Sequence, residues 1–318
     1  MTRNRAKETR SPVGRSKQNP RTGPARDGSG PAARDGNLAP GLYLVATPIG
    51  NLRDITLRAL DVLGAADVIA CEDTRVTARL LTTYAVTTPT IPYHDHNAAR
   101  ARPAIVKRVA EGQAVALVSD AGTPLISDPG LKLVRACAEE GLAVVAIPGA
   151  SAMLAGLAVA GLPTDRFLFA GFLPAKSAGR RRALEDLAGV PATLVFYEAA
   201  NRLPAALADM ADVLGPRPAA VARELTKLYE EIARGDLAEL AARYAEAGPP
   251  KGEVVVVVGP PEVAEIAGEV VDKRLTAALM RLSVRDASSE VADELGLPRR
   301  QLYERALQLL GRGGDKAR

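Results

Sequence analysis

Short apolar runs that end in turn residues recur along the first half of the chain. The clearest are AVALVS (114–119) and LAVVAIP (142–148), and an earlier run, GLYLVA (41–46), has the same form. Runs of Val, Leu, Ile and Ala without polar alternation are typical of strands buried on both faces, as in a parallel sheet covered by helices. Each run ends in a turn rich in Gly, Pro, Ser or Thr. Because ligands bind outside the carboxyl ends of such strands, the three turns predict one shared pocket.

Helices are predicted between these strands from capping signals and apolar spacing. Asp54 is expected to cap one helix, and Asp128 with Pro129 to begin another. VIAC (68–71) and a segment near Ile91 are expected to add two more strands. In the first of these helices, Leu57, Leu60 and Leu63 are expected to face the core. In the second, Leu131, Val134 and Ala138 are expected to do so.

The pattern changes around GLPTD (161–165), and later apolar runs are again separated by helical stretches. Those runs, at 166–172, 192–198, 219–224 and 252–259, predict a second α/β domain with a mixed sheet. The predicted fold is therefore two-domain α/β with a small C-terminal helical hairpin. Its expected parts are a disordered basic tail (1–40), an N-terminal α/β domain (41–160), a second α/β domain (161–261), and a linker with a helical extension (262–318).

The C-terminal hairpin has the spacing of a helix-turn-helix motif. Gly296 falls at the turn, and Arg299, Arg300 and Arg305 lie on the second helix. The same spacing also describes helical hairpins that bind no nucleic acid. The sequence alone therefore leaves nucleic-acid contact here open.

Charge is unevenly distributed along the 318 residues. The net charge is +4, but residues 1–40 hold nine basic and three acidic residues, which leaves 32 basic and 34 acidic residues in the remainder. The basic isoelectric point thus reflects the tail, and it does not by itself indicate a nucleic-acid-binding body. Cys71 and Cys137 lie in apolar segments and are expected to be free, buried thiols in a reducing cytoplasm. No apolar run is long enough to predict a membrane span.

Several common site types are absent from the sequence. No G-x-G-x-x-G follows the first strand, and neither G-x-x-x-x-G-K-[ST] nor G-x-S-x-G occurs, so dinucleotide, Walker-type and elbow-serine sites are not supported. His94 and His96 are the only histidines, and H-x-H without a neighbouring ligand set is a weak signal for metal. No metal is expected. The turns instead predict a cofactor held mainly by backbone groups at strand ends.

An ordered series of motifs connects the chain to a known family. From about Gly41 to Gly259 the sequence resembles the ribosomal RNA small-subunit methyltransferase I family of the tetrapyrrole methylase superfamily. The order of the motifs carries the resemblance more than any one of them. They are TPIGNLRDITLRAL, CEDTR, YHDHN, SDAGTPLISDPG, PGASA, GFLP, FYEAANRL, RELTKLYEE and KGEVVVV.

The resemblance implies an S-adenosylmethionine-dependent 2′-O-ribose methyltransferase that acts on a cytidine of the small-subunit ribosomal RNA decoding centre. It also implies a cytoplasmic homodimer with the cofactor between the two domains, and we expect the assembled subunit to be the substrate. By similarity the cofactor is expected to contact three loops and a closing segment of the second domain. These residues are Pro48, Gly50, Gly122, Thr123, Pro124, Ile126, Ser151, Ala152, Phe172 and Leu173.

Polar residues near the strand ends are candidates for the chemistry. Asp120, which leads the cofactor loop, and Arg75, which is suited to a phosphate, are expected to affect activity most. The sequence leaves open whether Asp73 with Arg75, and Glu224 with Lys227, are structural ion pairs. The expected substrate-binding residues are Glu72, Asp73, His94, Arg202 and Lys227, and the candidates for the general base are Glu72, Asp73, His94, Asp120, Glu198 and Lys227.

Two positions depart from the family pattern. The usual acidic residue after the YHxHN segment is Ala98 here, and the histidine-like position of FYE-x-x-x-R-L is Asn201. Neither position can be given an obligatory catalytic role from this sequence.

Two other functions are compatible with parts of the sequence. A tetrapyrrole C-methyltransferase of the same superfamily would share the cofactor loops. A non-catalytic, RNA-binding ribosome assembly factor would use Arg299, Arg300 and the basic tail, and it would bind RNA with steep salt dependence.

Overall fold

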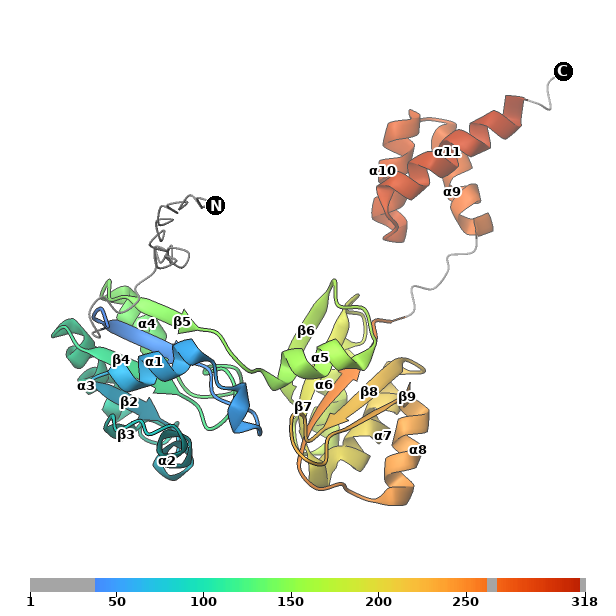
Figure 1. The fold of residues 1–318 in the computed structure, drawn as a ribbon. Helices are drawn as coiled ribbons and strands as arrows, with labels where there is room; N and C mark the ends of the chain where they lie inside the picture. The colour runs from blue at the N-terminus through green and yellow to red at the C-terminus, as the bar shows by residue number, and fades with distance from the viewer. Residues whose placement is uncertain (1–37, 262–267, 315–318) are drawn as a thin grey trace, which may run out of the picture.

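The computed structural model describes residues 38–261 and 268–314. The predictions of a disordered tail and of a linker after residue 261 fall largely outside these ranges. Within the described residues, the chain forms two α/β domains and a group of three C-terminal helices (Figure 1).

The first domain contains a parallel sheet with the strand order β3-β2-β4-β1-β5. Its strands agree closely with the apolar runs, which confirms the predicted parallel sheet. The strands are β1 (Gly41–Val45), β2 (Val68–Cys71), β3 (Thr90–Pro92), β4 (Ala114–Val118) and β5 (Val144–Ile147). The helical segments are η1 (Leu52–Asp54), α1 (Leu57–Ala65), α2 (Thr74–Thr83), α3 (Ala98–Ala110), α4 (Leu131–Glu139) and α5 (Ala152–Ala160).

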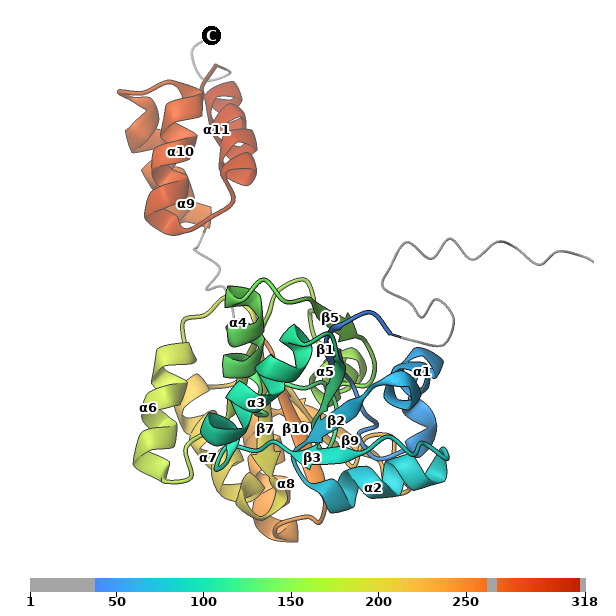
Figure 2. The same ribbon diagram turned by 90° about the vertical axis from the view of Figure 1, so that its left-hand side faces the viewer.

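Helices cover both faces of this sheet (Figure 2). Val62 and Leu63 of α1 pack against one face, and Ile105 of α3 with Leu133 of α4 packs against the other. β4 is buried at every residue. Burial on both faces explains why these strands are uniformly apolar and not alternating.

The second domain contains a mixed sheet with the order β6-β7-β10-β8-β9, as predicted from the later apolar runs. Only the β6–β7 pair is parallel. The strands are β6 (Phe167–Phe172), β7 (Thr193–Ala199), β8 (Pro218–Arg223), β9 (Glu231–Asp236) and β10 (Glu253–Val258). The helical segments are α6 (Ser177–Leu187), η2 (Ala200–Arg202), α7 (Leu203–Leu214) and α8 (Leu237–Ala247).

α5 joins the two domains by packing on the second sheet. Alternate β10 residues face opposite sides: Val254 and Val256 pack toward the cluster formed with α6, α7 and α8, whereas Val255 packs against α5. Gly156 allows α5 to approach closely, since a Cβ there would lie 2.8 Å from Cγ1 of Val255. The predicted boundary between residues 160 and 161 stays a prediction.

Both capping predictions are wrong. Thr56, not Asp54, caps α1, because its hydroxyl accepts a hydrogen bond from Ala59 N at 3.1 Å while Asp54 belongs to the preceding η1 turn. α4 begins after Gly130, and Asp128 lies in the preceding loop. The predicted core-facing residues are also partly wrong, because Leu57 and Leu131 are exposed. The buried residues are Ala59, Val62 and Leu63 in α1, and Leu133 and Cys137 in α4.

The three C-terminal helices are α9 (Gly268–Leu279), α10 (Val284–Leu295) and α11 (Arg299–Gly314). They share a core that includes Leu275, Val291 and Leu302. Gly296 ends α10 in the left-handed conformation, at the predicted turn. In the described parts of the chain, no helix combines the length and apolarity that crossing a membrane would require.

Candidate functional site

A cavity of about 640 Å³ lies between the strand ends of the first sheet and the second domain. The loop after β4, the start of α5 and the ends of β6, β7, β8 and β10 contribute to its wall. The residues that line it are Ile49, Asp120, Ala121, Gly122, Thr123, Ile126, Ser127, Asp128, Ala152, Phe172, Tyr197, Glu198, Ala199, Ala200, Asn201, Ala222, Leu225, Pro250, Gly252, Glu253, Val254 and Val255. This size is typical of small-molecule sites.

The cavity brings together half of the residues predicted to hold a cofactor. Gly122, Thr123, Ile126, Ala152 and Phe172 line it. Pro48 and Gly50 instead line a neighbouring cavity. Pro124, Ser151 and Leu173 line neither of them, and Leu173 is buried in the core of the second domain.

The loop after β4 is held in an unusual backbone conformation beside this cavity. Leu125 and Ser127 have φ angles of 75° and 67°. Positive φ is uncommon outside glycine, and such residues concentrate at ligand-binding sites because the surrounding structure must hold them in place. The Thr123 hydroxyl donates to Ala150 O at 3.2 Å and so ties this loop to the loop that precedes α5.

Two aromatic side chains belong to the wall contributed by the second domain. The rings of Phe172 and Tyr197 meet edge to face with centroids 5.6 Å apart. The Tyr197 hydroxyl accepts a hydrogen bond from Met153 N at the start of α5, over 3.1 Å. Phe172 is 56% exposed and lines the cavity, so it is well placed to cover a bound molecule.

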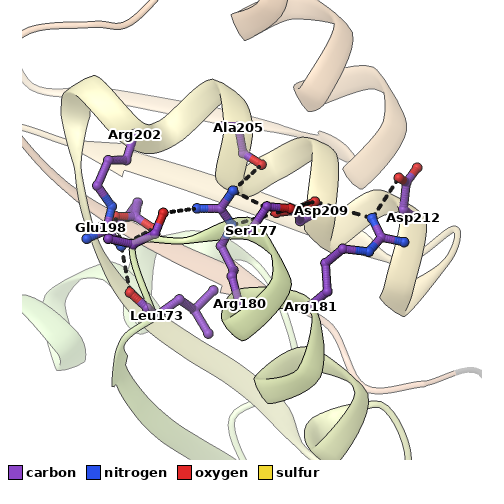
Figure 3. Close-up of polar contacts among 10 residues, drawn as sticks. Leu173, Ser177, Arg180, Arg181, Glu198, Arg202, Ala205, Asp209 and Asp212 are labelled. Atoms are coloured by element: carbon purple, nitrogen blue, oxygen red, sulfur yellow. Dashed lines mark hydrogen bonds and ion pairs between the residues drawn. The ribbon is translucent and has the colours of Figure 1, made fainter.

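Two arginines fix the segment that follows Phe172 (Figure 3). Arg202 donates to Leu173 O at 2.6 Å and pairs with the buried Glu198 at 2.9 Å. Arg180 donates to Ala175 O at 3.3 Å and pairs with Asp209. Arg202 therefore connects Glu198, which lines the cavity, to the segment after Phe172, and does not line the cavity itself.

A second cavity of about 480 Å³ adjoins the first. The two cavities share Ile49, Asp120, Ala121 and Glu253. Its remaining wall comes from the loop after β1, one face of α2, and Lys227. The full set is Thr47, Pro48, Ile49, Gly50, Leu52, Val76, Thr77, Arg79, Leu80, Thr83, Ser119, Asp120, Ala121, Lys227 and Glu253.

Asp120 stands on the wall between the cavities. Its Oδ1 accepts a hydrogen bond from Asp73 N at 3.0 Å, which fixes the carboxylate. Within the described residues, Oδ2 accepts no hydrogen bond. Asp120 therefore offers one oriented and one available oxygen at the point where the cavities meet.

Carboxylates are crowded around Asp120. Burial raises the pKa of Glu72, and the negative charges of Asp120, Asp128 and Asp95 raise it further. Burial also raises the pKa of Asp128, against a hydrogen bond with Ser119 that lowers it. This concentration of negative charge favours a cationic ligand nearby.

The two candidate ion pairs left open by the sequence are both formed. Asp73 and Arg75 make a bidentate contact, with Arg75 Nη2 2.7 Å from Asp73 Oδ2, and hydrogen bonds from Arg75 lower the pKa of Asp73 to about 2. Lys227 Nζ lies 2.8 Å from Glu224 and 2.9 Å from Glu253. Arg75 and Asp73 line neither cavity, whereas Lys227 lines the second.

The loop after β8 connects Lys227 to the first domain. Glu224 and Thr226 have φ angles of 53° and 66°, and such a value is a genuine outlier for the β-branched Thr226. The Thr226 hydroxyl accepts a hydrogen bond from Asn51 N at 3.3 Å. The strained backbone thus positions a contact between the two domains beside the second cavity.

The remaining candidates lie outside both cavities. His94 packs edge to face against His96, with ring centroids 6.0 Å apart, and its backbone N donates to Asn97. Glu72 lies in the carboxylate cluster and lines neither cavity. Among the described residues, no group of three or more His, Cys, Asp or Glu side chains is arranged to hold a metal ion. Cys71 and Cys137 are free and buried, as expected.

Sequence reasoning missed most of the wall that the second domain contributes. Ala222, Leu225 and Val255 line the first cavity, but as apolar strand residues they carry no motif of a ligand site. Asp128 was assigned to capping, although its place in the SDAGTPLISDPG loop was the available signal.

Comparison with known proteins supports the same family over most of the chain. Residues 41–241 match the model of the Tetrapyrrole (Corrin/Porphyrin) Methylases, and residues 264–310 match the RsmI C-terminal HTH domain. Ribosomal RNA small subunit methyltransferase I of Erythrobacter litoralis is 53% identical, over 86% of this chain and 96% of its own. The protein of that name from Mesorhizobium japonicum is 50% identical, over 87% and 95% respectively.

A solved structure supports the fold alone. The crystal structure of diphthine synthase aligns with a TM-score of 0.54 at 17% identity, covering 69% of this chain and 89% of its own. Fold similarity at this level does not determine a substrate. Taken with the cavity and the ordered motifs, the sequence relatives do determine the family, and this chain belongs to the ribosomal RNA small subunit methyltransferase I family of the tetrapyrrole methylases.

Proposed function

We propose that this methyltransferase uses S-adenosylmethionine to methylate the ribose 2′-hydroxyl of a cytidine in the decoding centre of small-subunit ribosomal RNA. The names of the relatives and the ordered motifs support an RNA substrate. A reaction on ribosomal RNA takes place in the cytoplasm, so the location follows from the proposed substrate.

The composition of the first cavity carries the proposal for the cofactor. The charged residues that line it, among those described, are Asp120, Asp128, Glu198 and Glu253, and all four are acidic. Arg202 neutralises Glu198 and Lys227 neutralises Glu253, so Asp120 and Asp128 are the carboxylates left for a cationic ligand. S-adenosylmethionine carries a sulfonium, an ammonium and ribose hydroxyls, and carboxylates suit each of these groups. Ile49, Ile126 and Phe172 add apolar surface for an adenine ring. These residues therefore fit the cofactor.

The proposed reaction needs alignment and the removal of one proton. When bound, S-adenosylmethionine supplies an activated methyl group, whose carbon–sulfur bond breaks as the bond to the ribose oxygen forms. Asp120 Oδ2 accepts the hydroxyl proton, while Oδ1 stays fixed by Asp73 N. Alignment of two reactants contributes on the order of 7–11 kcal/mol at best, so a site without metal suffices.

The charge of the two cavities argues against a tetrapyrrole substrate. Tetrapyrrole precursors carry many carboxylates and require an excess of cations around them. The first cavity presents only acidic charges among its described lining residues, and the second presents two cations and two carboxylates, Arg79, Lys227, Asp120 and Glu253. A nucleoside in RNA matches this balance better. A non-catalytic assembly factor would have no use for an enclosed acidic cavity.

The proposed function is tested by transfer of labelled methyl from S-adenosylmethionine. Small subunits from cells that lack the gene serve as the substrate, free ribosomal RNA is compared with them, and mass spectrometry identifies the product nucleoside. We expect 2′-O-methylcytidine on assembled subunits. If neither RNA substrate takes up label while the cofactor still binds, the proposed function is wrong.

We also propose that the enzyme acts as a homodimer, as the resemblance implies. Leu228 and Tyr229 follow Lys227 and are strongly exposed, which makes them candidates for the contact between subunits. Light scattering at several concentrations tests this proposal, and a monomer throughout would contradict it.

A further inference from the structure

The second cavity has no role in holding the cofactor as proposed above. It is large enough for a small molecule, at about 480 Å³ against a typical range of about 300–1,000 Å³. It adjoins the first cavity along a wall that includes Ile49, Asp120 and Ala121. A methyl acceptor in the second cavity would therefore meet a methyl donor in the first cavity at Asp120.

The rim of the second cavity provides apolar surface that the fold itself does not bury. Leu52 and Val76 line it and are 41% and 42% exposed. They come from separate elements, the η1 turn and α2, and both contribute to the same cavity. Bases taken out of a stack are held between aromatic or apolar side chains, so these two side chains suit the faces of a base.

The polar lining suits a ribose and its phosphates. Thr47, Thr77 and Ser119 line the buried floor of the cavity, where the Thr47 and Ser119 hydroxyls donate to the carbonyl oxygens of Ser119 and Ala121. Arg79 lines it from the exposed surface of α2. Lys227 lies on the second-domain side, where Glu224 and Glu253 neutralise it. Arg79 is therefore the cation best placed for a phosphate at the rim.

We propose that the second cavity receives the target nucleotide of the RNA, flipped out of its stack. The base lies between Leu52 and Val76, a flanking phosphate contacts Arg79, and the 2′-hydroxyl reaches Asp120. This proposal rests on the proposed function, because it assumes that RNA is the methyl acceptor. It assigns substrate binding to Val76 and Arg79 of α2 and to the loop after β1, and cofactor binding to the loop after β4.

Filling the cavity from its exposed rim separates substrate binding from cofactor binding. Val76→Trp places an indole in the second cavity without touching the first. We expect S-adenosylhomocysteine to bind with an unchanged Kd by calorimetry, while methyl transfer to small subunits falls at least about 100-fold. Ala78→Trp is the matched control: Ala78 is exposed on the same helix, lines neither cavity, and its variant should transfer methyl at the parent rate.

A second variant tests the phosphate contact without filling any space. Arg79→Glu should raise the KM for subunits about tenfold or more and leave the Kd for S-adenosylhomocysteine unchanged, since Arg79 lines only the second cavity. Thermal unfolding of each variant establishes that it is folded.

The outcomes separate this inference from the function on which it rests. If the parent protein methylates RNA and Val76→Trp does so at the same rate, the cavity assignment is wrong and the function stands. The assignment is also wrong if Val76→Trp and Ala78→Trp lose activity equally, or if Val76→Trp loses affinity for S-adenosylhomocysteine. If the parent protein transfers no methyl to RNA, the function and this inference fail together.

Discussion

Arg202 donates a hydrogen bond to the carbonyl oxygen of Leu173, over 2.6 Å, in the segment that follows Phe172 of the first cavity. The same guanidinium pairs with Glu198, whose side chain is fully buried. Through this contact, a residue that does not line the cavity supports the backbone directly after Phe172.

Loss of this contact should weaken cofactor binding more than it slows the chemical step. In Arg202→Ala, Glu198 is left buried without its cation, so we expect the free energy of unfolding to fall by about 1–3 kcal/mol. The segment after Phe172 also loses its support, so the KM for S-adenosylmethionine should rise about tenfold, while kcat falls by a smaller factor. Arg202→Lys, which keeps one donor, should recover part of the affinity.

Arg181→Ala is the matched control for this prediction. Arg181 pairs with Asp209 and Asp212 of α7 (Figure 3), and within the described residues it donates no hydrogen bond to the segment after Phe172. Its removal should leave the KM for the cofactor unchanged. An equal rise in KM for the two alanine variants would show that Arg202 has no specific positioning role.

Asp120 should be the most sensitive position for the chemical step. Asp120→Asn keeps the shape of the side chain and removes the proton acceptor at the wall between the cavities, so kcat should fall by about 10²–10⁴. Binding of S-adenosylhomocysteine, measured by calorimetry, should weaken far less than kcat falls, because Asp128 still lines the first cavity. Arg75→Ala should raise the KM for RNA. If both variants transfer methyl at the parent rate, the assignment of these two residues is wrong.

The carboxylate cluster should make stability depend on pH with a predictable sign. Burial and the neighbouring carboxylates raise the pKa of Glu72 in the folded state, so the folded state holds this proton more tightly than the unfolded state does. Relative to Glu72→Gln, the parent protein should therefore lose stability as the pH rises from about 4.3, the value of an unfolded glutamate, through the raised pKa. Below that window the two should be equally stable, as urea unfolding between pH 4 and 8 can establish.

Asp73 provides a control, because its effect on stability should depend on pH in the opposite direction. Arg75 lowers its pKa to about 2, so its contribution is present above about pH 3.9 and is lost as the pH falls toward 2. Asp73→Asn should therefore differ most from the parent protein near neutral pH and converge with it in acid. The same pH dependence in both variants would contradict the assignment of the two shifts.

The C-terminal helices allow the roles of individual arginines to be separated. Arg305 makes two hydrogen bonds to Asp272 at 2.6 and 2.7 Å, and Arg300 pairs with Glu304, so both are engaged within the helices. We expect Arg305→Met to lower the thermal stability of the chain and to leave the salt dependence of RNA binding unchanged. Arg299→Met should reduce the slope of log K against log salt by about one, if Arg299 contacts a phosphate.

The strands were predictable from the sequence where they form apolar runs, which includes the edge strands β5 and β6, and not where an edge strand is polar. β4 and β10 form continuous apolar runs because helices cover both of their faces. β9 was missed because its sequence, EIARGD, contains charged residues and Gly and pairs only with β8 at the edge of the sheet. Polar residues at such an edge carry no signal that distinguishes a strand from a loop.

The candidate site was predictable only where one loop forms it. The SDAGTPLISDPG segment indicated the first cavity, because closely spaced Gly, Pro and Ser are needed for its backbone conformation. The second cavity is assembled from α2, the loop after β1, and Lys227 of the other domain. These parts are distant in sequence and ordinary in composition, so only their packing reveals the cavity.

The close approach of Gly50 and Lys227 gives a direct test of how the domains meet at the second cavity. Gly50 has a φ of 154°, and a Cβ there would lie 2.5 Å from Cγ of Lys227. The lysine is held by Glu224 and Glu253 and has little room to withdraw. Gly50→Ala should therefore separate the lysine from its partners and lower both stability and methyl transfer. Gly64→Ala, in α1 with nothing within 4 Å of the added Cβ, should instead stabilise by about 0.5–1 kcal/mol.

A double-mutant cycle then separates the steric clash from the strain of the backbone. Lys227→Ala removes the atoms that the new Cβ would meet, so Gly50→Ala should destabilise Lys227→Ala less than it destabilises the parent protein, and the two substitutions should not be additive in urea unfolding. Additive effects would mean that the cost comes from the φ angle of Gly50 alone. In that case Lys227 would not be the residue that requires glycine here, and the contact between the loop after β1 and the second domain would rest on Asn51 and Thr226.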